Sequence, residues 1–388
     1  MKSSNWLLGV MLLGLTAEIR AQTSGPGSVK LNLTSPQEYQ VFQRQTKILG
    51  ELRLSGRVVL SSPDTPAPEK LEVRVLGSPL EGKLRSEWQP LPFDPHVAAF
   101  RSTLPVPAGG WYRVELRAVR KGVSVGGVVV EHVGMGEVFV IAGQSNSANH
   151  GEEKQTTTTG MVTAPTGTRW QLANDPQPGA SGEGGSFLPS LGDALHARLK
   201  VPIGLVATGV GATSVREWLP RSSRIANLPT LTGRVVATGP GQWESDGSIF
   251  ASFIARLEPL GSLGFHAVLW HQGESDANQS DPKRTLSGRF YREYLQRLIG
   301  ETRRAIGWDV AWFVAQASYH TPEDPGSADI RNAQRSLWHQ ERVLPGPDTD
   351  ALTGDLRDAG GKGVHFSGKG LREHGRRWAE LVGDWLEK

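Results

Sequence analysis

The fold of this chain is decided by one stretch, Val138-Phe139-Val140-Ile141-Ala142-Gly143-Gln144-Ser145-Asn146. Its first five residues form a continuous apolar run, which predicts a buried central strand of a parallel sheet. The run ends at a glycine, and a serine between two amide side chains follows. Open α/β sheets bind ligands at the carboxyl ends of their strands, where helix starts favour negative charge. We therefore predict that Ser145 is a nucleophile at such a strand end.

The composition limits the classes of function that need to be considered. The chain has 388 residues, enough for two domains, and 38% of them are hydrophobic, enough for a sizeable core. The formal net charge is only +3 and no cluster of Lys and Arg stands out, so nucleic acid is not an expected partner. Because the chain contains no cysteine, disulfides, thiolate metal sites and cysteine nucleophiles are excluded.

Residues 1–21 have the pattern of a secretory signal peptide. Lys2 supplies a positive end, residues 6–17 form a short apolar core, and Ala21 is a small residue at the expected cleavage site. This core is too short to span a bilayer, and no later stretch is long and apolar enough to do so. We expect export to a bacterial periplasm or the medium, since a cysteine-free chain fits such a compartment. The alternative is a buried N-terminal helix.

Residues 22–133 are expected to form an N-terminal all-β, immunoglobulin-like sandwich domain. Short alternating or β-branched segments occur at 47–56, 71–75, 112–118 and 123–130. Turns rich in Pro, Gly and Ser separate them, as at 61–68 and 107–110. Regular short strands with frequent turns indicate a β-sandwich. No catalytic constellation is evident in this region.

Residues 134–388 have an α/β pattern, in which apolar strand-like runs alternate with longer helical patterns. This part is expected to be the catalytic domain. We predict strands at 138–142, 203–207, 267–270 and 311–315 and helices at 249–260, 286–306 and 371–386. The segment 151–189 is long and poor in helical pattern, which is typical of functional or mobile loops.

Acyl transfer needs a nucleophile, a base and donors for the oxyanion, and three further segments offer such groups. Gly209 and Gly211 follow the second predicted strand, where the backbone can approach a substrate closely and present an N–H. Polar residues at 271–276 crowd the end of the third strand. His365 lies on a glycine-rich approach to the C-terminal helix.

These segments resemble the blocks of a known superfamily. They are Gly143-Gln-Ser-Asn146, Gly211-Ala-Thr-Ser-Val-Arg-Glu-Trp218, Trp270-His-Gln-Gly-Glu-Ser-Asp276 and His365-Phe-Ser367. Their order over residues 134–388 is similar to that of the SGNH/GDSL hydrolases, in particular the sialate O-acetylesterase and carbohydrate-esterase branch. The resemblance implies a flavodoxin-like α/β/α sandwich that removes acetyl groups from carbohydrates and uses neither a metal nor another cofactor.

The resemblance also implies roles for individual residues. Ser145 would be the nucleophile and His365 the general base. The oxyanion hole would combine the N–H groups of Ser145 and Gly211 with a side chain of the third block. Ser275 stands where the superfamily commonly has an asparagine, so we expect Gln272, which has the same donor chemistry, to complete the hole.

The acid that orients the base is less clearly marked. The superfamily usually has an aspartate three residues before the histidine, but Lys362 stands there and cannot accept a hydrogen bond. We predict Asp358 as the acid and read residues 359–363 as an insertion between acid and base. Asp355 is an alternative, and so is a Ser–His dyad in which a backbone carbonyl orients His365.

Other residues of the same types offer rival interpretations. His271 is the best rival base, with His150 and His320 behind it. Glu274 and Asp276 are expected to support the end of the third strand through hydrogen bonds rather than to form a glycosidase pair.

The sequence thus predicts an exported serine esterase that removes O-acetyl groups from an acetylated glycan or a sialic acid. A lipid or aryl esterase on the same fold and a non-catalytic carbohydrate-binding protein are the alternatives. The sequence gives no indication of the oligomeric state.

Overall fold

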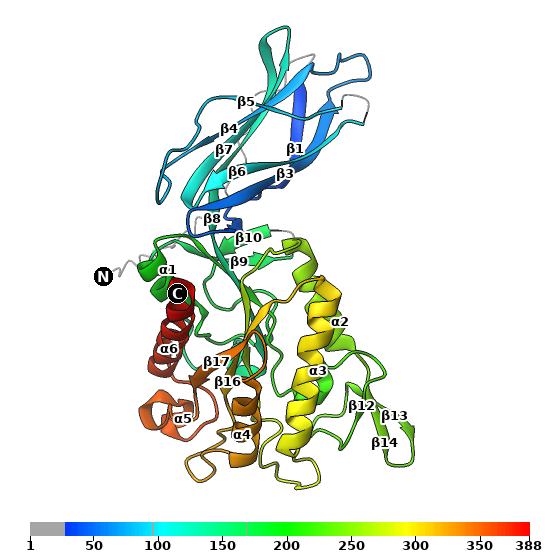
Figure 1. Cartoon of the computed structure of the whole chain (residues 1–388), viewed down its shortest axis with the longest axis vertical. Coiled ribbons are helices and arrows are strands. Elements are labelled where there is room, and N and C mark those ends of the chain that lie inside the picture. Colours follow the sequence, from blue (N-terminus) through cyan, green and yellow to red (C-terminus); the bar gives the residue numbers. More distant parts are fainter. Residues whose placement is uncertain (1–27, 95–96, 168) are drawn as a thin grey trace, which may run out of the picture.

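The computed structural model describes residues 28–94, 97–167 and 169–388. The molecule is elongated, with a β-rich part at one end and a mixed α/β part at the other (Figure 1). The predicted signal peptide, residues 1–21, lies outside the described residues. Within the described ranges, no helix combines the length and the hydrophobicity needed to cross a membrane.

All regular elements in the described part of residues 28–133 are strands. They lie in two mainly antiparallel groups that pack around one core, in which Leu52, Leu71 and Val114 are buried. The first group is β1 (Val29–Ser35), β3 (Leu49–Leu60) and β6 (Ala99–Pro107). The second is β4 (Lys70–Leu76), β5 (Gln89–Leu91), β7 (Gly109–Arg120) and the first half of β8 (Val123–Gly143). The alternating segments of the sequence therefore form strands as predicted.

Strand β8 runs through both parts of the molecule. Its first half pairs antiparallel with β7, and its last residues pair in parallel with β11 (Ile203–Ala207) and β15 (Ala267–His271). The short β2 (Val41–Gln43) pairs with the middle of β8, at residues 134–136. The change of pattern near residue 134 thus falls inside one 21-residue strand.

The α/β part is built on a sheet with the strand order β10-β9-β11-β8-β15-β16-β17. All its neighbouring strands are parallel except β9 and β10. The remaining bounds are β9 (Val162–Thr166), β10 (Arg169–Leu172), β16 (Ala311–Gln316) and β17 (Val343–Asp348). The four predicted strands are confirmed. β17 was not predicted because Pro345 and Gly346 interrupt its pattern, which an edge strand tolerates.

Helices cover both faces of this sheet (Figure 1). α1 (Leu188–Leu199) and α6 (Gly368–Glu387) pack on one face, and α2 (Ser248–Leu257), α3 (Gly288–Ile306) and α4 (Ala328–Leu337) on the other. Side chains of β8 alternate between the two cores: Val138 and Val140 join the α2–α4 side, whereas Phe139 and Ile141 join the α1–α6 side. All four are fully buried, which explains why this strand is apolar at every position.

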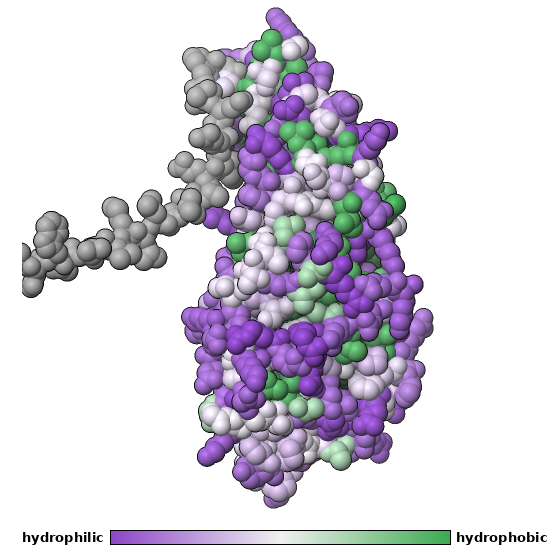
Figure 2. Space-filling view, turned by 90° about the vertical axis from the view of Figure 1, so that its left-hand side faces the viewer, coloured by the Kyte–Doolittle hydropathy of each residue, from purple (hydrophilic) through white to green (hydrophobic). Residues whose placement is uncertain are grey.

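Several shorter elements connect the main strands and helices. A small sheet made of β12 (Arg224–Ile225), β13 (Val235–Gly239) and β14 (Gln242–Ser245) is inserted between η2 (Val215–Trp218) and α2. The other short elements are η1 (Ser145–Ser147), η3 (Glu258–Leu260), η4 (Gly354–Leu356) and α5 (Asp358–Gly361). Figure 2 presents a face that is mostly hydrophilic, on which hydrophobic residues are scattered in small groups.

Candidate active site

A cleft of about 730 Å³ lies beyond the carboxyl end of β8. Three of the residues predicted from the sequence line it: Ser145, Gly211 and His365. Asp358 and Gln272 lie behind its wall, outside the lining residues. The cleft is also lined by His150, Ser181, Arg234, Glu274, His320 and Lys362. The structure therefore brings together residues that are more than 200 positions apart in the chain.

Ser145 is placed by the tight turn at the end of β8. Gly143 has φ of 129°, and a Cβ at this position would lie 2.0 Å from the carbonyl oxygen of His271, so that no other residue fits. The carboxamide oxygen of Gln144 accepts a hydrogen bond from the N–H of Ser275 at 3.0 Å. Ser145 then begins η1 with 6% of its surface exposed. The nucleophile candidate is thus fixed between the end of its own strand and the loop after β15.

His365 lies beside the predicted acid Asp358. The Nδ1 atom of His365 is 3.5 Å from Oδ2 of Asp358. The turn between them includes Ala359 and Gly360 with φ of 50° and 67°, so the extra residues loop out while acid and base stay adjacent. Asp355 instead pairs with Lys369 at 2.5 Å, and 71% of its side chain is exposed. Of the two aspartates, it is therefore Asp358 that faces the histidine.

The segment before His365 is tied to the nucleophile turn. The side-chain amide of Asn146 donates to Oε1 of Glu274 at 2.9 Å and to the carbonyl oxygen of Val364 at 3.1 Å. The same carbonyl accepts a hydrogen bond from Nη1 of Arg357 at 2.7 Å. Arg357 is buried between the rings of Tyr319 and Phe366. The residue after Ser145 and the residue before His365 are therefore linked directly.

Gly211 lies in the loop after β11, and its backbone N–H points toward another residue of the cleft wall. This N–H donates to Oγ of Ser181 at 2.6 Å, and the same hydroxyl is 3.1 Å from Nε2 of His150. A Cβ on Gly211 would lie 2.6 Å from Nε2 of His150, so the close approach requires a glycine. An oxyanion that accepts from Gly211 must take the place of the Ser181 hydroxyl.

Gln272 is fully buried and braces the loops beneath the cleft. Its Nε2 donates to Oδ2 of Asp276 at 2.7 Å, to the carbonyl oxygen of Thr213 at 3.1 Å and to Oε1 of Gln144 at 3.2 Å. A direct contact with an oxyanion would require these bonds to break, because an amide nitrogen has only two hydrogens. The observed position is that of a support for the turn that carries Ser145.

The carboxylates of the third block have structural partners. Asp276 accepts hydrogen bonds from the hydroxyl of Ser214 at 2.5 Å and the N–H of Val215 at 2.9 Å, and it lies 3.2 Å from Nη2 of Arg216. This bears out the expectation that Asp276 supports the end of the third strand. Glu274 holds Asn146 with one oxygen, while its other oxygen is buried without a hydrogen-bond partner among the described residues.

The rival histidines differ in their surroundings. His271 is buried below the cleft, where Nε2 lies 2.9 Å from Oγ1 of Thr349 and burial lowers its pKa. His320 has both nitrogens engaged, with Nδ1 at 2.7 Å from Asp324 and Nε2 at 2.6 Å from the carbonyl oxygen of Glu274. His150 stacks on His365 with a centroid distance of 5.5 Å, and burial together with the charge of His365 lowers its pKa.

Sequence reasoning missed three residues of the cleft wall: Ser181, Arg234 and Lys362. Ser181 belongs to the segment 151–189, whose length and lack of helical pattern had indicated a functional loop. Arg234 lies in the insertion that forms the small sheet, where no motif marks it. Lys362 stands out in the sequence only because the superfamily usually has an aspartate at this position, three residues before the histidine.

Comparisons with known proteins identify the family. Residues 135–383, more than half of the chain, match the model of the family described as carbohydrate esterase, sialic acid-specific acetylesterase. Among curated proteins, no sequence gives a significant match.

Solved structures match the chain at low sequence identity, and the first of the three given below has a similar fold. A carbohydrate acetylesterase from Xanthomonas citri is 19% identical with a TM-score of 0.53, over 91% of this chain and 74% of that one. A protein from Arabidopsis thaliana is 18% identical with a TM-score of 0.44, over 63% of this chain and 96% of that one. A family two carbohydrate esterase from Cellvibrio japonicus is 10% identical with a TM-score of 0.36, over 93% and 98% of the two chains. On the strength of the family match, the chain belongs to the sialic acid-specific acetylesterase family of carbohydrate esterases and is a carboxylic ester hydrolase.

Proposed function

We propose that this protein is an exported serine esterase that removes O-acetyl groups from a sialic acid or a polysaccharide. The observation that carries the proposal is that Ser145 and His365 line one cleft at the carboxyl end of β8, with Asp358 behind the histidine. The family match supports an acetylated carbohydrate as the substrate. The alternative of a non-catalytic binding protein does not agree with this family, whereas a lipid or aryl esterase remains the second candidate.

In the proposed reaction, Oγ of Ser145 attacks the acetyl carbonyl carbon while Nε2 of His365 accepts the hydroxyl proton. The same nitrogen then donates this proton to the departing sugar oxygen, which leaves an acetyl-serine. A water molecule, deprotonated by His365, attacks the acetyl carbonyl carbon; the bond to Oγ of Ser145 then breaks, acetate leaves, and His365 returns the proton to Oγ. Asp358, which faces Nδ1 at 3.5 Å, holds the imidazole in the required tautomer and stabilises its charged form.

The oxyanion of the tetrahedral intermediate would accept hydrogen bonds from the N–H groups of Ser145 and Gly211. The Gly211 N–H would exchange its 2.6 Å bond to the Ser181 hydroxyl for one to the oxyanion. Gln272 takes part through Gln144, which neighbours Ser145, and not as a direct donor, because its Nε2 already has three protein acceptors. Once the Ser181 hydroxyl is displaced, N–H donors arranged in this way stabilise the negative charge that develops in the transition state.

The finer fold and the location of the protein are part of the proposal. We assign residues 134–388 to a flavodoxin-like SGNH sandwich and residues 22–133 to an immunoglobulin-like domain that positions it or contacts polymer. Parallel strands between two helical layers and two packed antiparallel sheets support these assignments. Export rests on residues 1–21 of the sequence alone.

The experiment that tests the function measures acetate release from a panel of acetylated glycans by wild type, Ser145→Ala and His365→Ala. We expect each substitution to lower kcat by about 10³-fold or more, since members of such a unit are individually essential. Melting curves check that the variants fold. Activity of His365→Ala near that of wild type would contradict the mechanism. Faster hydrolysis of longer acyl chains than of acetyl groups would favour the lipid esterase.

A further inference from the structure

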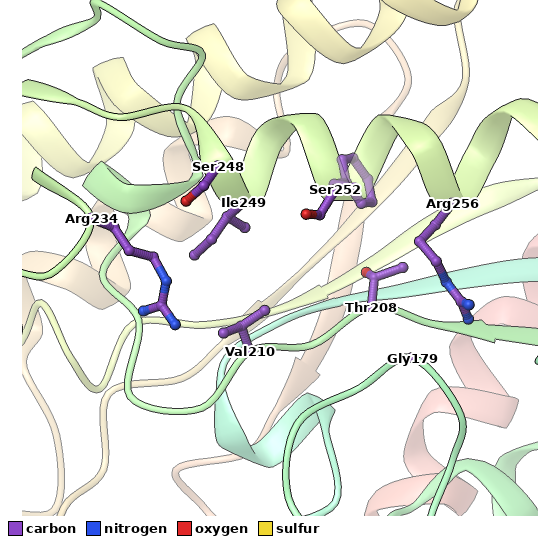
Figure 3. Close-up of a pocket in the computed structure, with 9 residues that line it drawn as sticks. Gly179, Thr208, Val210, Arg234, Ser248, Ile249, Ser252 and Arg256 are labelled. Carbon is purple, nitrogen blue, oxygen red and sulfur yellow. The ribbon is translucent and has the colours of Figure 1, made fainter. Parts of the chain in front are cut away.

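We propose that a second pocket, adjacent to the catalytic cleft, binds the carboxylate of an acidic sugar in the same glycan chain as the acetylated unit. This inference rests on the proposed function and names the substrate as an acidic oligosaccharide. The pocket encloses about 220 Å³ and is lined by Arg234, Arg256 and Ser252, together with Thr208 and Val210 (Figure 3). Two guanidinium groups and a serine hydroxyl are suitable donors for a carboxylate.

Arg256, which comes from α2, is a cation without an anionic partner. Its Nη2 donates to the carbonyl oxygens of Pro165, Pro178 and Ala207 at 3.2, 3.0 and 3.3 Å. Its Nε is buried and has no hydrogen-bond partner, and no carboxylate lies within ion-pair distance among the described residues. Burial alone lowers its pKa. A charge that is desolvated without a counterion is costly, and an anion in the pocket would offset this cost.

Arg234 forms the opposite end of the pocket (Figure 3). Its Nη1 donates to Oε1 of the buried Glu217 at 3.1 Å, which leaves other N–H groups of the guanidinium for a ligand. Ser252 lies between the two arginines and is exposed. Ser248 also lines the pocket, and its hydroxyl donates a hydrogen bond to Oδ1 of Asp246 at 2.7 Å. Asp246 is therefore an acidic residue close to the pocket, but it is not part of the lining. The lining itself contains two arginines and no acidic residue.

The pocket and the catalytic cleft share a wall. Val210 and Arg234 line both, and the N–H of Val210 donates to the carbonyl oxygen of Gly143 at 2.9 Å. Gly143 lies two residues before Ser145. The wall between the pocket and the cleft is therefore in direct contact with the turn that carries Ser145. One glycan chain can place its acetyl ester at Ser145 and a neighbouring carboxylate between the arginines.

The test compares two O-acetylated oligosaccharides that differ only in whether the neighbouring sugar is a uronic acid or its neutral counterpart. We expect Arg256→Gln to lower the ratio of kcat/KM for the acidic over the neutral substrate by about tenfold or more. Ser252→Asp adds a negative charge to the pocket lining, one helical turn before Arg256, and should lower the ratio in the same direction. Arg224→Gln is the matched control: it removes a positive charge from the neighbouring β12, where 85% of the side chain is exposed. This control should keep the wild-type ratio.

A ratio that stays at the wild-type value in both Arg256→Gln and Ser252→Asp would overturn the proposal. A binding measurement separates this result from a failure of the proposed function. Calorimetry with Ser145→Ala and a non-acetylated uronic acid oligosaccharide should give binding that is weakened by the additional Arg256→Gln change. Equal binding by the two proteins would refute the pocket, whether or not the wild type releases acetate.

Discussion

His365 and Asp358 are in contact through both their side chains and their backbones. Nδ1 of His365 lies 3.5 Å from Oδ2 of Asp358, and the Asp358 N–H donates to the His365 carbonyl oxygen at 3.0 Å. A bridge between Arg357 and Phe366 continues this antiparallel contact. The backbone thus holds the two residues together although they are seven positions apart. In the proposed mechanism, this pairing lets Asp358 take the part that the superfamily usually gives to an aspartate three residues before the histidine.

The first prediction concerns the acid. Asp358→Asn should lower kcat by about 10²- to 10⁴-fold, because an amide at this position no longer stabilises the imidazolium or fixes its tautomer. Asp355→Asn is the control, since it breaks only an exposed ion pair with Lys369 and should leave kcat near wild type. Steady-state acetate release provides both values. If the two variants are equally active, a Ser–His dyad replaces the triad.

The second prediction concerns the link between nucleophile and base. Asn146→Ala removes the hydrogen bonds to Glu274 and Val364 and leaves Oε1 of Glu274 with only the Nδ1 atom of His271 at 3.8 Å, while Oε2 has no hydrogen-bond partner among the described residues. We expect kcat to fall about 10- to 100-fold with little change in KM, because buried polar groups without partners rearrange and displace the His365 segment. Asn227→Ala, which loses one hydrogen bond to Thr285 away from the cleft, is the matched control. A larger effect on KM than on kcat would argue against a positioning role.

The third prediction concerns stability against pH. Burial and the charge of His271 keep the pKa of His374 well below its usual value, and burial lowers that of His271. Below about pH 6.5 the unfolded chain therefore binds protons at these positions that the folded protein does not bind. The free energy of unfolding should fall as the pH drops through this range, by up to about 1.4 kcal/mol per pH unit for each histidine.

Chemical denaturation of wild type and His374→Gln between pH 7.5 and pH 5 checks this expectation. The variant should show a shallower loss of stability with falling pH, whatever its absolute stability. His339→Gln changes an exposed histidine and should reproduce the wild-type slope. Identical slopes for all three proteins would mean that His374 does not contribute.

The fourth prediction concerns the buried ion pair at the base of the α/β sheet. Nε of Arg44 lies 2.7 Å from Oε1 of Glu137, and His266 approaches the second oxygen at 2.6 Å. Burial opposes ionisation of Glu137, yet His266 and Arg44 together lower its pKa. Arg44→Met should cost about 3–5 kcal/mol and lower Tm by at least about 5 °C, because it removes the guanidinium partner of a buried carboxylate.

Arg376→Met on α6 is the comparison for this variant. Its guanidinium pairs with Glu373 and Glu380 on the helix surface, where such pairs contribute only tenths of a kcal/mol. Calorimetric melting should therefore separate the two arginines clearly. Equal Tm values for both variants would show that the Arg44 pair contributes no more than a surface pair.

The sheet could be predicted from the sequence where its strands are apolar at every position. Val138 to Ala142 and the strands 203–207, 267–271 and 311–316 are buried on both faces, so their composition alone reveals them. β17 belongs to the same sheet but is its edge strand, where Pro345 and Gly346 are tolerated, so its sequence lacks the continuous apolar run. α1 contains a proline and glycine that weaken its helical pattern, although its packing against α6 stabilises it.

Residues of the cleft could be predicted where they belong to a sequence block, which follows a strand for Ser145 and Gly211 and precedes α6 for His365. Gln272 has the donor chemistry of an oxyanion residue, and its burial beneath Gln144 depends on loop packing that no local pattern encodes. Arg234 and Arg256 come from an insertion and from the side of a helix. Only the three-dimensional arrangement shows that they face one pocket.

The continuity of β8 has a mechanical consequence. The first half of β8 is hydrogen-bonded to β7, and the same strand ends at the turn before Ser145. The N-terminal sheets are therefore joined to the α/β part by a paired strand, and not by a flexible linker that would let the two parts move relative to each other. A break within residues 134–143, which pair with β2, β11 and β15, would disturb the turn before Ser145 as well as the neighbouring strands. Under the proposed function, a glycan bound by the N-terminal strands would therefore be held at a constant distance from Ser145.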